Sequence, residues 1–173
     1  MRPSTPFVMP DAPTPPAGSP DLFEEIAFVD ASPIGKSPKS TVGTYLKVHD
    51  RLRKLLAATE DAVLAGVDAS AFSFNRPGGR CETCDGAGFE KVEMQFLADV
   101  HVPCADCGGA RFGPEVLGVR IDGRTISEVL ALSLDEAAEV FADDAQLVAR
   151  LAPAREVGLG YLELGQSVVT LSG

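Results

Sequence analysis

The stretch Cys81-Glu-Thr-Cys84, followed after nineteen residues by Cys104-Ala-Asp-Cys107, holds every cysteine of the chain. A CxxC turn brings two thiolates onto one edge of a tetrahedron, and a second turn delivered by a hairpin supplies the other two. Zn–S distances of about 2.3 Å then close a structural Zn²⁺ site. Four thiolates leave no open coordination position, so such a site holds the fold and does not catalyse. We therefore predict a four-cysteine zinc module with Zn²⁺ as a structural cofactor.

Two other interpretations of the cysteines are a pair of disulfides or four ordinary buried thiols. Disulfides are rare in proteins that are not exported, and the first residues show neither the charged start nor the apolar stretch of an export signal. Glycines follow both pairs and suit tight turns that aim backbone amides at the sulfurs. His101 lies three residues before Cys104, but four sulfurs already fill the site. We expect His101 to be a strand residue.

The charge of the chain is unevenly distributed. The 173 residues carry 25 acidic and 15 basic side chains, a net charge of −10, which by itself argues against binding a phosphate backbone. Residues 33–80, however, hold eight basic and four acidic side chains, whereas residues 81–173 hold six and sixteen. Arg76 and Arg80 lie in the turn before Cys81, and Lys91 follows the first cysteine pair. These three are candidates for DNA contacts; the other interpretation is that they are solvated charges matching the acids of the module.

The length is sufficient for one domain with a core. No apolar run approaches the roughly 18 to 20 residues of a membrane span, so we expect a soluble, cytoplasmic protein. We divide the chain into four parts: a disordered proline-rich lead (1–22), a loop and basic helical region (23–70), the four-cysteine module (71–118) and a helical segment (119–173).

Periodicity predicts elements within these parts. Residues 36–44 read as a loop, and residues 45–64 as an amphipathic helix broken near Thr59. The alternation of Val92, Met94 and Phe96 predicts a half-buried strand, and residues 100–102 alternate in the same way.

The last part carries further local signals. Residues 116–121 read as a strand ending in an Asp-Gly turn. Capping boxes at Thr125 and Ser133, each with Glu three residues later, predict two helix starts. A last helix over 144–157 contains Pro153, which we expect to kink or divide it.

Two families share motifs with the chain. The stretch Cys81-Glu-Thr-Cys84-Asp-Gly-Ala-Gly88 fits the CxxCxGxG repeat of DnaJ-type chaperones, but the second repeat ends in Arg111, and no J-domain His-Pro-Asp occurs. A longer resemblance, from about Ile26 to Gly173, is to the UvrA family, the damage-recognition ATPases of the bacterial UvrABC excinuclease. It is carried by residues 30–45, 72–84, 91–94, 102–104 and 157–166.

The resemblance to UvrA implies an α+β fold: a partial ABC-type ATPase domain, from the Q-loop to the start of the signature motif, with an inserted four-cysteine zinc ribbon. Thr170-Leu-Ser-Gly173 resembles the opening of the family's signature, so Ser172 and Gly173 are implied to bind nucleotide in the complete assembly. Amides at a helix N-terminus form an anion site of this kind. The implied partners are damaged double-stranded DNA, a UvrB-like protein and a second UvrA subunit.

Some motifs of the family are missing. No GxxxxGK[ST] phosphate loop and no strand ending in Asp-Glu occur, so we expect no catalytic residue here, and binding of ATP with Mg²⁺ only in a complete parent protein. Ala31 stands where the family has its Q-loop glutamine, and alanine cannot coordinate Mg²⁺. Either nucleotide coupling is altered, or the chain derives from a divergent paralogue such as the UvrA-like proteins linked to drug resistance.

The leading functional hypothesis is a piece of a UvrA-like excision-repair ATPase that contributes zinc-dependent DNA binding and part of a nucleotide-binding cassette. The second is a stand-alone zinc-ribbon adaptor that binds a protein partner through the acidic helices after Ser133. The third is a non-functional gene fragment that retains a metal site.

Overall fold

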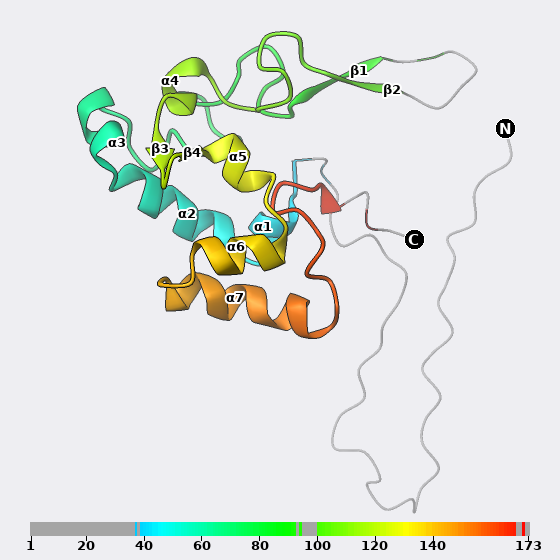
Figure 1. The fold of residues 1–173 in the computed structure, drawn as a ribbon. Helices are drawn as coiled ribbons and strands as arrows, with labels where there is room; N and C mark the ends of the chain where they lie inside the picture. Colours follow the sequence, from blue (N-terminus) through cyan, green and yellow to red (C-terminus); the bar gives the residue numbers. More distant parts are fainter. Residues whose placement is uncertain (1–36, 38, 93, 95–99, 169–170, 172–173) are drawn as a thin grey trace, which may run out of the picture. The chain divides into compact units, whose positions relative to one another are not determined.

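The computed structural model describes residues 37, 39–92, 94, 100–168 and 171 (Figure 1). All of them belong to one structural unit, Ala31–Gly173. The expected disordered lead, Ala31, Ser172 and Gly173 fall outside the described residues.

Three helices precede the cysteines: α1 (Val42–Tyr45), α2 (Val48–Ala57) and α3 (Glu60–Ala65). The prediction of a loop up to Thr44 is wrong in its last residues, because the Thr41 side chain accepts a hydrogen bond from the Thr44 amide and starts α1. The helical prediction that follows is confirmed in α2 and α3, and so is the break near Thr59. The Thr59 hydroxyl accepts from the Ala62 amide and caps α3.

Two short antiparallel hairpins follow. In the first, β1 (Phe89–Val92) pairs with β2 (Val100–Pro103), and Lys91 lies opposite His101. The strand predicted over 100–102 is confirmed, and His101 is a strand residue as expected. The strand predicted from Val92 to Phe96 is wrong in its bounds, because β1 ends at Val92 and Met94 lies outside it. The prediction that the strands are half-buried is wrong: Val92, Val100 and Val102 are each about 45% exposed, because the buried clusters of the described residues include no residue of this ribbon. Phe96 falls outside the described residues.

The second hairpin joins β3 (Arg120–Ile121) to β4 (Arg124–Thr125) through the predicted Asp-Gly turn. The strand predicted over 116–121 is wrong in its first half, where α4 (Pro114–Leu117) forms instead. Pro114 occupies the first turn of this helix, where its fixed φ favours helix and its missing N–H costs nothing.

Three helices complete the fold: α5 (Ile126–Leu130), α6 (Leu134–Val140) and α7 (Ala145–Glu156). Both predicted capping boxes are confirmed, at Thr125 for α5 and Ser133 for α6. The predicted last helix is also present. It is not divided by Pro153, which lies in its interior three residues before the end.

The main hydrophobic core joins the helices to the loops that flank the cysteines. Helix α7 packs against α2 and α6, and Figure 1 shows α6 and α7 side by side. The largest fully buried side chains include Leu52, Leu56, Phe72, Phe74, Phe112, Ile126, Leu134, Leu147, Leu151 and Leu164. Phe74 and Phe112 precede and follow the two cysteine pairs and meet edge to face, with ring centroids 6.0 Å apart. The base of the cysteine module is therefore anchored in the core.

The segment after α7 returns to the beginning of α1. Thr41 and Ser167 form an antiparallel bridge. The Val42 amide donates to the Gln166 carbonyl at 2.9 Å, and the Val168 amide donates to the Ser40 carbonyl at 2.9 Å. The residues around Thr41 and those around Ser167 are thus hydrogen-bonded to each other, although they lie far apart in the sequence.

Among the described residues, none of the helices has the length and apolar character needed to cross a membrane.

A four-cysteine candidate metal centre

The four cysteine sulfurs converge on one point. The Sγ atoms of Cys81 and Cys104 are 4.0 Å apart, those of Cys84 and Cys107 are 3.7 Å apart, and all four lie within 4.8 Å of one another. Zn–S bonds of about 2.3 Å imply tetrahedral S–S edges of about 3.8 Å. None of the four is in a disulfide. The donor set and its spacing therefore fit a tetrahedral thiolate metal such as Zn²⁺, with all four predicted ligands brought together.

The two cysteine pairs are followed by the same pattern of left-handed residues, and we call the two stretches the first knuckle (81–88) and the second knuckle (104–111). Each has left-handed residues at the same three offsets after its pair: Asp85, Gly86 and Gly88 in the first, and Gly108, Gly109 and Arg111 in the second. This path turns amides back toward the sulfurs, and the Gly88 amide donates to Cys84 Sγ at 3.2 Å. In the sequence, these turns are indicated by the glycines that follow each cysteine pair.

Gly86 shows why this trace needs glycine. Its φ is +76°, and a Cβ added there would lie 2.1 Å from the Phe74 carbonyl oxygen. The first knuckle is thus packed directly on the loop that leads from the core.

The close approach of the four cysteine thiols is unfavourable for their ionised forms unless a cation is bound. Burial raises the pKa of the Cys107 thiol to about 12, whereas the backbone amide of Cys84 donates to Cys81 and lowers the pKa of that thiol. Four thiolates within van der Waals distance repel one another, and a bound divalent cation removes that cost by coordinating all four. The chemistry of the site therefore fits a metal ion, which would be held by Cys81, Cys84, Cys104 and Cys107.

The three candidate DNA contacts have different surroundings. Arg76 is exposed in the turn before the first knuckle, and Lys91 is exposed in β1. The Arg80 side chain is only 18% exposed and pairs with Asp85 at 2.5 Å. Lys39 also reaches Asp85, because its Nζ donates to the Asp85 carbonyl at 2.7 Å. Lys39 was missed as a candidate because it is 46 residues from its partner; its only sequence signal is membership of the basic block.

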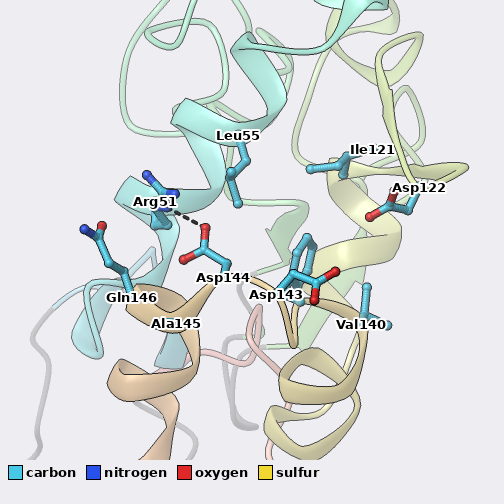
Figure 2. Close-up of a pocket in the computed structure, with 10 residues that line it drawn as sticks. Arg51, Leu55, Ile121, Asp122, Val140, Asp143, Asp144, Ala145 and Gln146 are labelled. Atoms are coloured by element: carbon cyan, nitrogen blue, oxygen red, sulfur yellow. Dashed lines mark hydrogen bonds and ion pairs between the residues drawn. The ribbon is translucent and has the colours of Figure 1, made fainter.

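A depression of about 410 Å³ lies between α2 and the start of α7 (Figure 2). Arg51 points across it to Asp144, with Nε donating to Oδ2 at 2.7 Å, and Asp144 also caps α7 by accepting from the Leu147 amide. Burial acts to raise the pKa of Asp144, but the hydrogen bonds from Leu147 and Arg51 outweigh it, and the pKa is lowered. The pair joins α2 to α7, and we assign it a structural role.

Known proteins that resemble the chain are UvrA proteins. UvrABC system protein A of Mycobacterium bovis is 49% identical over 153 residues, which cover 88% of this chain and 16% of that protein. The protein of the same name from Helicobacter pylori is 45% identical over 151 residues, 87% of this chain and 16% of the relative. The crystal structure of UvrA2 from Deinococcus radiodurans superposes with a TM-score of 0.80 at 49% identity, over 83% of this chain and 18% of that one. No protein-family model matches the chain.

The fold and the site define a mixed helix-and-strand segment built around a four-cysteine module compatible with zinc. The α+β class predicted from the sequence is therefore confirmed. The identities and the shared structure show further that the chain is homologous to one segment of UvrA, as its motifs indicated, and it spans about 16% of the length of these relatives. The resemblance to DnaJ-type chaperones is confined to the knuckle motif.

Proposed function

We propose that the chain acts as part of a UvrA-like DNA-damage-recognition ATPase of nucleotide excision repair in the cytoplasm. The observation that carries the proposal is the 49% identity to UvrABC system protein A over 88% of the chain. In this proposal the chain contributes a zinc-dependent DNA-binding surface and part of an ATP-binding cassette. Its partners are damaged double-stranded DNA, a UvrB-like protein and a second UvrA subunit, and ATP with Mg²⁺ binds in the larger assembly.

The cysteine module supports a DNA contact through its basic side chains. Bound Zn²⁺ would fix the two knuckles, and the first knuckle holds Arg80 in place through Asp85. Lys39 approaches the same aspartate from the preceding segment. Arg76 and Lys91 are exposed on either side of the first knuckle in sequence. A metal-fixed platform of this kind would place several cations against one stretch of phosphate backbone.

Fluorescence anisotropy with a short duplex, with and without a bulky adduct, tests the DNA-contact proposal. We expect Arg76→Ala, Arg80→Ala and Lys91→Ala each to weaken binding. Each substitution that removes a cation from a phosphate should also lower the slope of log K against log salt by about 0.9.

The matched control is Lys54→Ala, an exposed lysine of α2 in the same basic block but outside the module. It should change affinity and salt slope little. Unchanged affinity and slope in all three module variants would contradict the DNA contact, and binding that ignores DNA but follows a protein partner would support an adaptor instead.

A further inference from the structure

Arg111 occupies a position where the first knuckle has a glycine. It is the counterpart of Gly88, four residues after the second cysteine of its pair, and its φ of +70° is one that residues with a Cβ rarely adopt. Glycine would take this conformation without strain. The arginine must therefore be explained by what its side chain contacts.

The Arg111 side chain runs from the knuckles to the segment after α7. Its Cγ lies over the first knuckle, since a Cβ added to Gly88 would be 2.8 Å from it. The guanidinium carbon lies 5.4 Å from the centroid of the Phe74 ring. Its Nη2 donates to the Gly165 carbonyl at 3.1 Å.

The charge of Arg111 is influenced by the cysteine sulfurs and by a backbone carbonyl. Burial lowers the pKa of Arg111, and the sulfurs of Cys84 and Cys107 act in the opposite direction. A Zn²⁺ ion with four thiolates carries a formal charge of about −2, so a loaded site would attract the buried guanidinium. At the other end the partner is a carbonyl dipole.

The segment that receives Arg111 is also held by backbone hydrogen bonds. The carbonyls of Gly160, Leu162, Leu164 and Gln166 accept from the amides of Asp135, Leu134, Gly43 and Val42, and the Val168 amide donates to the Ser40 carbonyl. The Gly165 amide donates to the Leu130 carbonyl at 2.6 Å, and the Leu164 amide donates to the Leu132 carbonyl at 2.9 Å. This segment leads to Leu171, where the sequence resembles the UvrA signature motif.

We propose that Arg111 is a positioning residue that couples the metal centre to residues 157–168. The second knuckle holds the guanidinium over Phe74, and the guanidinium donates to the Gly165 carbonyl, so that order in the knuckles is transmitted to the segment preceding Leu171. The inference concerns coupling within the chain and does not depend on DNA binding.

Hydrogen exchange of the Zn²⁺-loaded full chain, read by mass spectrometry, tests this coupling. In Arg111→Gly we expect the amides of 157–168 that lie close to Gly165 to exchange about tenfold faster, because a charge-assisted hydrogen bond is removed, while α5 and α6 keep their protection. The Co²⁺-substituted chain should keep the absorption of tetrahedral thiolate coordination. Glycine relieves the strain at this position, so a role confined to the knuckle backbone would leave 157–168 unchanged.

Two further variants make the outcome decisive. Arg76→Ala removes another arginine of the module, one that is exposed in the turn before the first knuckle, and should leave the exchange of 157–168 as in the wild type. Arg111→Lys keeps the positive charge but loses the planar, forked guanidinium, so it should also speed exchange in 157–168. This variant tests the coupling if the glycine variant does not fold. Unchanged exchange in both Arg111 variants, an equal rise in α5 and α6, or loss of the metal spectrum would overturn the proposal.

Discussion

At the scale of single residues, two glycines with nearly the same φ show how the cysteine module is attached to the core. Gly86 (φ +76°) has no room for a Cβ beside the Phe74 carbonyl, whereas Gly66 (φ +67°), which ends α3, has open space around the same position. We expect Gly86→Ala to destabilise the Zn²⁺-loaded chain by roughly 3 kcal/mol or more, because it adds a clash to left-handed strain. Gly66→Ala should cost only about 1 kcal/mol of strain. Urea unfolding of both variants measures the difference, and equal losses would contradict it.

His49 gives the stability of the chain a pH dependence. It is 5% exposed, packs on Phe74 with ring centroids 4.8 Å apart, and has a buried Nε2 that makes no hydrogen bond within the described part of the chain. Burial, together with the charges of Arg53 and Arg111 and against that of Asp50, lowers the pKa of His49 from 6.5 to about 4.

The unfolded chain therefore binds a proton below pH 6.5 that the folded chain resists until about pH 4. Stability is complete above pH 6.5 and should fall by roughly 3 kcal/mol as the pH decreases through this window. Chemical denaturation at a series of pH values measures the fall. His49→Phe should lose this component, and because metal release affects both proteins, the difference between them isolates His49. Parallel pH profiles for the two proteins would show that the histidine contributes nothing.

At the scale of elements, α4 and α7 place proline in opposite situations. Pro114 is at the first position of α4, where its φ favours the helix, while Pro153 lies inside α7 and denies a hydrogen bond to the carbonyl of Ala149 four residues earlier. Pro153→Ala should stabilise the chain by about 1 to 2 kcal/mol, less than the full helix-interior cost because Pro153 also restricts the unfolded chain. Pro114→Ala should be neutral or slightly destabilising. Thermal melts of the two variants test the contrast, which fails if both shift in the same direction.

The elements also show what the sequence could predict. The capping boxes of α5 and α6 and the break at Thr59 are local devices, made by residues three apart, so their patterns were sufficient. The apolar run 116–121 fits a helix end as well as a strand, and the decisive signal, Pro114, lies just outside it. Whether the β1–β2 ribbon is exposed depends on whether another element packs on its faces. The alternation of apolar and polar residues predicts a strand but does not show such packing.

At the scale of the whole molecule, the cysteine cluster and the main core are separate hydrophobic clusters joined through Phe74 and Phe112. The cluster was predictable because CxxC spacing fixes ligand geometry locally, whereas Arg111 was not, since its partner Gly165 lies 54 residues away. Loss of a bound metal should leave the four cysteine sulfurs, three of them in buried residues, without the ion that joins them, and should loosen the anchor between the two clusters.

Removal of Zn²⁺ with a chelator should therefore lower the melting temperature by more than about 10 °C, followed by circular dichroism. Cys107→Ser should melt near the temperature of the chelated wild type and respond little to the chelator. A cooperative wild-type melt that the chelator leaves unchanged would refute the structural role of the metal.

The bridge between Thr41 and Ser167 has a consequence for protein engineering. A stretch of polypeptide whose entry and exit are neighbours can be transplanted: a host loop that opens by one strand spacing, about 4.8 Å, could receive residues 41–167 without being pulled apart. The same closure permits circular permutation, with these two positions linked and new termini cut at the exposed Asp122-Gly123 turn. In such a protein the order of the chain would change while the cysteine module and its anchor stayed the same.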